Sequence, residues 1–160
     1  MSLVYHLRKN LKCCRFTHLH KLIISNPSMI LLEEYLETER GFYEVNSYTE
    51  NGHTPLMLAA MNMGDLNRVS LIESLLINGA NVDCLDSEGN SLLMLTIQYS
   101  TFKTENELLK FIQYLISQYA DTTVMNYYRR TVIDICYERG CEKVMKYILE
   151  YNRYLSKVKI

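Results

Sequence analysis

The strongest concentration of residues that could perform chemistry lies near the N-terminus. Cys13 and Cys14 are followed by His18 and His20, so four possible metal ligands occur close together in the chain. Zinc sites usually pair their cysteines at C-x2-4-C spacing, and adjacent cysteines clamp an ion poorly. A small Cys/His metal-binding protein therefore remains an open but weaker alternative, and we predict no metal site.

Other catalytic patterns are absent from the sequence. There is no G-x-S-x-G elbow, no Walker loop, no G-x-G-x-x-G and no H-E-x-x-H. Asp83, Asp86 and Asp121 fall at expected turns, where aspartate is favoured because its side chain hydrogen-bonds nearby backbone N–H groups. We therefore expect a protein that is not an enzyme and needs no cofactor.

The elements that position these residues recur along the chain. Residues 51–60 read NGHTPLMLAA and residues 75–83 read LLINGANVD. Gly52 suits a turn in which a Cβ would be costly, and Thr54 can cap a helix that begins with proline. A leucine-rich stripe at helical spacing then predicts a second helix, which Gly79 ends in the left-handed conformation.

This succession of hairpin, helix, turn and helix resembles the ankyrin repeat, whose signature is T-P-L-H-x-A with a period of about 33 residues. Weaker copies are anchored at Thr17, Ser91 and Thr131, on either side of the copy anchored at Thr54. The anchors lie 37, 37 and 40 residues apart, so each unit is longer than the family period. We expect the excess in connecting segments, where insertions cost little. These segments are 38–44, 61–68 and 98–107.

The resemblance implies an all-α solenoid of about four helix–turn–helix units, with short β-hairpin or loop connections and degenerate terminal caps. We expect a single domain over residues 1–160, with units at approximately 15–47, 48–84, 85–124 and 125–156. An elongated surface without a closed pocket is suited to binding rather than to catalysis.

The same resemblance assigns structural roles to several reactive side chains. His20 occupies the histidine position of the signature, where we expect hairpin hydrogen bonds, and Asp134 replaces that histidine in the last unit. Cys136 stands where a buried alanine is usual, which favours a small packed residue over a nucleophile. Tyr119 and Arg129 replace expected glycines, so we expect the fourth hairpin to differ in shape or to be shortened.

Composition indicates a globular chain, with 48% apolar and 22% charged residues, no membrane-length apolar run and no apparent secretory signal. Residues 1–21 are basic and residues 33–50 acidic, a layout typical of solvated caps or of a surface that steers a charged partner. The net charge of −1 argues against nucleic-acid binding. Five cysteines without a regular framework favour a reducing compartment, so we expect the cytoplasm.

In ankyrin-like stacks, the hairpin tips and the exposed positions of the first helices line a concave groove that contacts partners. The positions of this chain that match are Tyr48, Glu50, Asn51, His53, Met61 and Asn62, then Leu85, Ser87, Glu88, Asn90, Gln98 and Tyr99, then Tyr127, Tyr128 and Arg130. Tyrosine and arginine dominate interface hot spots, which favours the cluster of residues 127–130. Alternatively, tyrosine is simply abundant, with 13 in 160 residues, and Tyr127 or Tyr128 only covers the next repeat.

These patterns predict a monomeric, non-catalytic module that binds a partner protein, as an adaptor or as a stoichiometric inhibitor. A structural solenoid that self-assembles through its apolar terminal faces is the second alternative. The looped-out turns and the abundance of Asn, Ile and Tyr resemble ankyrin proteins of large DNA viruses of amoebae, or those of intracellular bacteria. Either source would make a host protein the natural partner.

Overall fold

The computed structural model describes residues 16–62, 64 and 69–158, and all regular elements in these ranges are helices. The helices are α2 (His18–Ile24), α3 (Met29–Leu36), α4 (Glu39–Glu44), α5 (Pro55–Met61), α6 (Val69–Ile77), α7 (Leu92–Tyr99), α8 (Glu105–Ser117), α9 (Val132–Arg139) and α10 (Glu142–Val158). Within the described ranges, strand pairing is limited to the isolated bridges Leu85–Ser91 and Met125–Thr131. The all-α prediction is confirmed.

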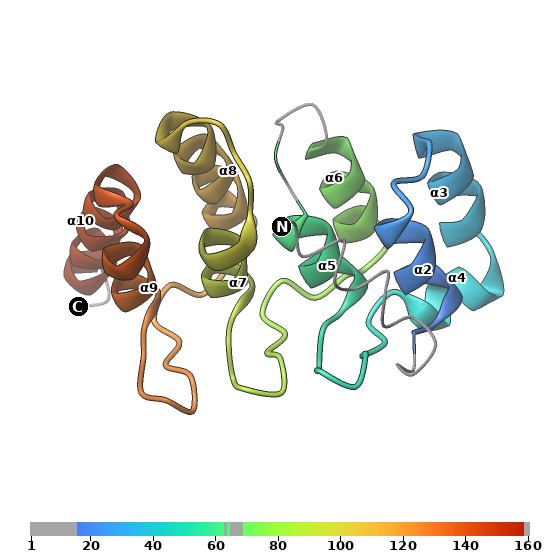
Figure 1. Cartoon of the computed structure of the whole chain (residues 1–160), viewed down its shortest axis with the longest axis horizontal. Coiled ribbons are helices and arrows are strands. Elements are labelled where there is room, and N and C mark those ends of the chain that lie inside the picture. Colours follow the sequence, from blue (N-terminus) through green and yellow to red (C-terminus); the bar gives the residue numbers. More distant parts are fainter. Residues whose placement is uncertain (1–15, 63, 65–68, 159–160) are drawn as a thin grey trace.

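The helices are arranged as a row of antiparallel pairs. The first helices α2, α5, α7 and α9 contact one another in series, and α3 with α6 and α8 with α10 pack in the second layer. Figure 1 shows the pairs side by side along the long axis, with the loops between units extending from one edge. This arrangement is the solenoid expected from the repeated sequence.

Each first helix begins at the predicted anchor. The hydroxyls of Thr54 and Ser91 accept hydrogen bonds from the N–H groups three residues on, at 3.3 and 3.4 Å, which satisfies a donor that lacks an intrahelical partner. In the last unit, Asp134 accepts from the Thr131 N–H at 2.6 Å and from its hydroxyl at 2.7 Å. The structural role expected for Asp134 is therefore a helix cap.

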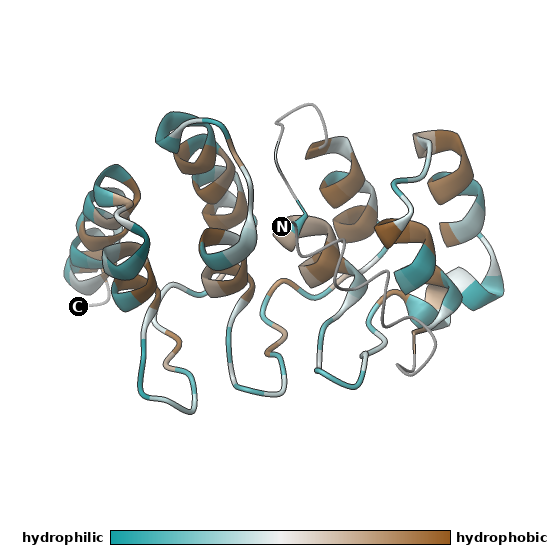
Figure 2. Ribbon diagram, in the orientation of Figure 1, coloured by the Kyte–Doolittle hydropathy of each residue, from teal (hydrophilic) through white to brown (hydrophobic). Residues whose placement is uncertain are grey.

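The buried apolar side chains form one continuous cluster that runs from Leu19 in α2 to Ile148 in α10. Figure 2 shows the hydrophobic faces of the paired helices turned toward one another. Each helix pair thus buries its apolar stripe partly against the next pair, which is why no unit is stable alone. The unit boundaries proposed above remain a prediction.

The extra residues of the first unit form a helix rather than a loop. Thr38 caps α4 by accepting from the Gly41 N–H at 3.0 Å. At the other end of α4, Glu44 accepts from the Leu19 N–H at 2.8 Å and from the Tyr35 hydroxyl at 2.9 Å. The insertion is therefore tied to the first turn of α2 through a carboxylate.

The expectation that Arg129 alters or shortens the fourth hairpin is wrong. The Asn126 N–H donates to the Arg130 carbonyl at 2.9 Å and the Arg129 N–H to the Asn126 carbonyl at 2.9 Å, the same ladder as in residues 86–90. Arg129 adopts φ 61° and Tyr119 φ 67°, so both take the left-handed conformation of the glycines they replace. This conformation costs a residue with a Cβ only about 1–2 kcal/mol, which the surrounding hydrogen bonds offset.

Candidate functional site

The hairpins are hydrogen-bonded to one another, so their tips form one continuous edge. The Ser87 N–H donates to the Asn51 carbonyl at 3.1 Å, and the Tyr127 N–H donates to the Glu88 carbonyl at 3.0 Å. Each bond joins the tip of one hairpin to the tip of the next. The side chains on this edge are therefore held at fixed spacing, as a binding surface requires.

Two glycines permit this close approach. A Cβ on Gly52, whose φ is +74°, would lie 2.3 Å from the Ser87 nitrogen. A Cβ on Gly89 would lie 3.0 Å from the Tyr127 ring. Neighbouring hairpins can therefore touch only because these positions have no side chain.

A row of buried polar side chains supports the hairpins from behind. The His20 Nε2 donates to the His53 carbonyl at 3.1 Å, which confirms the hairpin hydrogen bond expected for His20. The His53 Nε2 lies 3.8 Å from an Asp86 carboxylate oxygen, and Asn126 donates to the Asn90 side chain at 2.7 Å. Burial lowers the pKa of both histidines, although the Asp86 charge opposes this at His53. Both imidazoles are accordingly neutral near pH 7.

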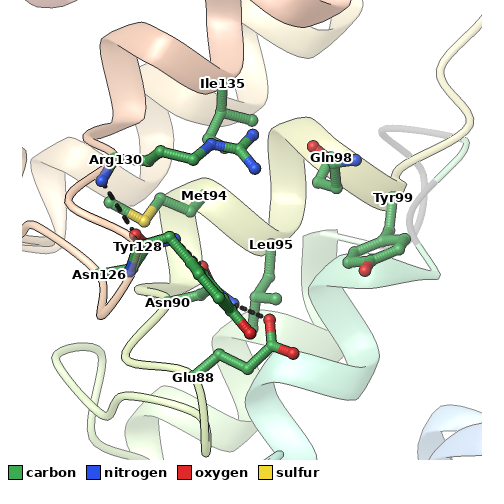
Figure 3. Close-up of a pocket in the computed structure, with 10 residues that line it drawn as sticks. All are labelled: Glu88, Asn90, Met94, Leu95, Gln98, Tyr99, Asn126, Tyr128, Arg130 and Ile135. Atoms are coloured by element: carbon green, nitrogen blue, oxygen red, sulfur yellow. Dashed lines mark hydrogen bonds between the residues drawn. The ribbon is translucent and has the colours of Figure 1, made fainter.

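Two adjoining hollows lie between the hairpin edge and the first helices, and together they are called the groove below. The second, third and fourth hairpins pair around residues 49–53, 85–91 and 125–131. The first hollow is bounded by the second and third hairpins and by Met61. The second hollow, of about 100 Å³, is bounded by the third and fourth hairpins and by α7 and α9 (Figure 3). Glu88, Asn90 and Tyr99 line both, so the hollows form one surface.

Most of the residues predicted to bind a partner surround the groove. Those that line it are Asn51, His53, Met61, Ser87, Glu88, Asn90, Gln98, Tyr99, Tyr128 and Arg130. Those that do not are Tyr48, Glu50, Asn62, Leu85 and Tyr127. Tyr48 instead donates its hydroxyl to the Cys84 sulfur at 3.2 Å. A role in partner binding stays a prediction for all fifteen.

The structure separates the two neighbouring tyrosines of the fourth hairpin. Tyr128 lines the second hollow and is 64% exposed. The Tyr127 ring lies against Gly89, so it covers the preceding hairpin rather than the next repeat. Of the favoured cluster, Tyr128 and Arg130 therefore face the groove, and Tyr127 does not line it.

Sequence reasoning missed the apolar floor of the second hollow. Met94, Leu95 and Ile135 line it, although each is almost wholly buried. Their helical spacing predicts only that they are core residues. Nothing in the neighbouring sequence distinguishes a core residue that borders a hollow from one that is enclosed on all sides. Asn126 was also missed, although it takes the hairpin position that Asp86 occupies one unit earlier.

Two of the residues that line the second hollow carry polar atoms without partners. Gln98 Oε1 and Arg130 Nε are buried atoms with no hydrogen-bond partner among the described residues. The terminal nitrogen of Arg130 pairs with Glu138, so the charge of the guanidinium is offset while its Nε–H remains unused. The second hollow therefore combines an apolar floor with one unused donor and one unused acceptor.

The structure bears on only half of the N-terminal Cys/His cluster. Both ring nitrogens of His20 are engaged, Nδ1 by the Thr17 N–H at 3.2 Å and Nε2 by the His53 carbonyl. The His18 ring packs against the Tyr35 ring at an interplanar angle of 32°, with 5.0 Å between ring centroids. Cys13 and Cys14 lie outside the described residues, as do the basic residues Arg8, Lys9, Lys12 and Arg15. Within the part of the chain that the structure describes, no three such side chains gather into a metal-sized cluster.

Burial disfavours the thiolate form of Cys136 and Cys141. Burial raises the pKa of Cys136 to about 12, and burial also raises the pKa of Cys141. A thiolate is the reactive form, so these side chains are packing residues at neutral pH.

None of the described helices is both long enough and apolar enough to cross a membrane.

Comparison with known proteins agrees with the geometry. A family model described as ankyrin repeats, in three copies, matches residues 64–158. The chain is also 26% identical over 133 residues to protein glp-1 of Caenorhabditis elegans; the match covers 81% of this chain but only 10% of glp-1. Since the family model spans more than half of the chain and the helix pairs stack as its repeats require, the chain belongs to the ankyrin repeat family.

Proposed function

We propose that the chain is a non-catalytic binding module that holds a partner protein in the groove. Ankyrin repeats are generally protein–protein interaction modules, and the family is typically non-enzymatic. The observation that carries the proposal is the groove itself, where exposed Tyr99 and Tyr128 stand over a floor of Leu95 and Ile135. Aromatic side chains above an apolar floor are the usual anchors of an interface.

The rigidity of the groove supports binding without a large ordering cost. The bonds from hairpin to hairpin and the buried row from His20 to Asn126 hold its walls in place. A preorganised surface loses little conformational entropy on association. In our proposal the chain acts as a monomeric single domain in the cytoplasm, as an adaptor or an inhibitor, with a host protein as partner if the source is a virus or an intracellular bacterium.

Crosslinking in a host-cell lysate tests this proposal. The wild-type chain is expected to capture a discrete partner, and Tyr128→Ala is expected to lose it because the ring forms a wall of the second hollow. Tyr154→Ala is the matched control, since Tyr154 is 63% exposed but lies on α10, away from the groove. Capture that survives Tyr99→Ala and Tyr128→Ala together would contradict binding in the groove.

The alternative metal function has less support. Metal binding at the N-terminal cluster through His20 would require one of its ring nitrogens to give up a hydrogen bond, since Nδ1 and Nε2 are both engaged. Metal analysis of the purified chain separates the two functions, because stoichiometric zinc would favour the alternative.

A further inference from the structure

We propose that the second hollow binds a lysine or arginine side chain carried by an extended segment of the partner. Glu88, Tyr99 and Tyr128 would receive the cation, while Gln98 and Arg130 would pair with the partner's main chain. This inference rests on the proposed function, since it names the chemistry that the groove recognises.

The charge of the hollow favours a cation. The Glu88 side chain is exposed, and the only hydrogen bond to its carboxylate among the described residues comes from Asn90 Nδ2, at 3.4 Å. Nearby Asp86 is not neutralised by His53, because burial lowers the pKa of that imidazole. Among the described residues, Arg130 is the one basic side chain that lines the hollow, and Glu138 offsets its charge. The hollow therefore has a net negative charge.

The walls and floor suit the rest of a basic side chain. Figure 3 shows Tyr128 and Tyr99 on either side of Leu95, with Glu88 at the edge below them. Tyrosine faces attract a cation through their quadrupole, and an apolar floor accommodates the methylene stem of lysine or arginine. A hollow of about 100 Å³ accepts one such side chain and no large ligand.

The unpaired atoms fit a peptide main chain. Among the described residues, Gln98 Oε1 is a covered acceptor without a donor and Arg130 Nε is a covered donor without an acceptor, so each side chain would turn toward the hollow to meet a partner. Figure 3 shows the Arg130 side chain extending beneath Ile135 in the direction of Gln98. One peptide unit supplies an N–H and a carbonyl, so a single extended segment satisfies both atoms. A free amine or a metal cation would leave the Arg130 donor unused.

Nuclear magnetic resonance titration of the isotope-labelled full chain tests the inference. The probes are the blocked peptides acetyl-Gly-Lys-Gly-amide and its arginine, norleucine and glutamate analogues. We expect the lysine and arginine peptides to shift the amide signals of Glu88, Tyr99 and Tyr128. The norleucine peptide keeps an apolar side chain like the lysine stem but lacks the charge, so it is expected to bind about three- to tenfold more weakly than the lysine peptide.

Variants separate the charge from general effects. Glu88→Gln is expected to weaken binding of the lysine peptide by about three- to tenfold, and added salt is expected to reduce the difference in affinity between wild type and variant. Glu150→Gln makes the same charge change on the exposed face of α10 and is expected to leave binding unchanged. The inference is overturned if the lysine peptide causes no shifts or if the norleucine or glutamate peptide binds as tightly as the lysine peptide. It is also overturned if Glu88→Gln does not change binding of the lysine peptide.

The lysate experiment distinguishes this failure from failure of the proposed function. If Tyr128→Ala abolishes partner capture but Glu88→Gln does not, the groove binds a partner by other chemistry and only this inference falls. If capture survives Glu88→Gln and also survives Tyr99→Ala and Tyr128→Ala together, the groove is not the binding surface and both proposals are contradicted.

Discussion

Replacing Glu44 by glutamine removes the carboxylate that joins the inserted helix α4 to the start of the solenoid. Its oxygens accept from the Leu19 N–H at 2.8 Å, from Tyr35 at 2.9 Å and from Arg40 Nε at 2.9 Å. The side chain is only 11% exposed, so the contacts form largely out of solvent. A glutamine has the same shape but no charge, and its nitrogen cannot accept a hydrogen bond.

The magnitude follows from the pKa of Glu44. Burial alone would raise this pKa, but the hydrogen bonds from Leu19, Arg40 and Tyr35 lower it from 4.5 to about 2. Each pKa unit corresponds to about 1.4 kcal/mol, so the ionised carboxylate contributes about 3 kcal/mol to the free energy of unfolding at neutral pH. Because the folded pKa is depressed, the contribution is complete above pH 4.5 and is lost as the pH falls toward 2.

Urea denaturation followed by circular dichroism measures this contribution. At pH 7, Glu44→Gln is expected to lower the free energy of unfolding by about 3 kcal/mol, and near pH 2 its stability should approach that of wild type. Glu34→Gln, an exposed carboxylate on the neighbouring helix α3, is the control and should have little effect. Equal urea midpoints for wild type and Glu44→Gln at pH 7 would refute the reasoning.

Three further predictions concern the backbone and the buried histidines. Tyr119→Gly is expected to raise the free energy of unfolding, measured by urea denaturation, by up to about 1 kcal/mol. Glycine adopts the left-handed φ of this position without strain, and the tyrosine side chain that is removed is 86% exposed. A lower free energy of unfolding would show that the tyrosine makes an important contact. Gly52→Ala is expected to lower the free energy of unfolding by about 3 kcal/mol and Gly79→Ala by about 1 kcal/mol, because only the Cβ at residue 52 meets the neighbouring hairpin. Equal shifts of the thermal unfolding midpoint in the two variants would contradict this. Burial lowers the pKa of His20 and His53, so their contribution to stability is complete above pH 6.5 and is lost as the pH falls below it, by up to about 1.4 kcal/mol per pH unit for each histidine. In urea denaturation, the free energy of unfolding of the wild type should therefore fall between pH 7.5 and 5.5, and His53→Asn should reduce this fall. A wild-type free energy that does not change over this range would exclude the histidine contribution.

Local chemistry explains why much of the fold could be predicted. The hydroxyl of Thr54 caps the helix that follows it, and Gly79 ends the next helix at φ 88°, so both boundaries depend on nearby residues alone. The apolar stripes of α8 and α10 likewise follow from residue spacing. Such signals need no knowledge of the rest of the chain.

The failures concern positions where local and tertiary preferences conflict. The replacement of a glycine by Arg129 predicted a different hairpin, but the bond from Tyr127 to the preceding hairpin holds the usual one. Residues 38–44 were expected to be only an insertion, but residues 39–44 form a helix that Glu44 anchors at the distant Leu19 N–H. Neither contact can be inferred from residue spacing within one unit.

The same division applies to the groove. The resemblance to the ankyrin repeat implied that Glu88, Tyr99 and Tyr128 lie on a common surface, since they take equivalent positions in successive units. Docking of one hairpin against the next decided which of them meet around a hollow, that Tyr127 covers Gly89 instead, and that Gln98 and Arg130 keep unpaired atoms there. Periodicity describes one unit at a time, whereas a binding site between units depends on distances that exist only after the units have packed.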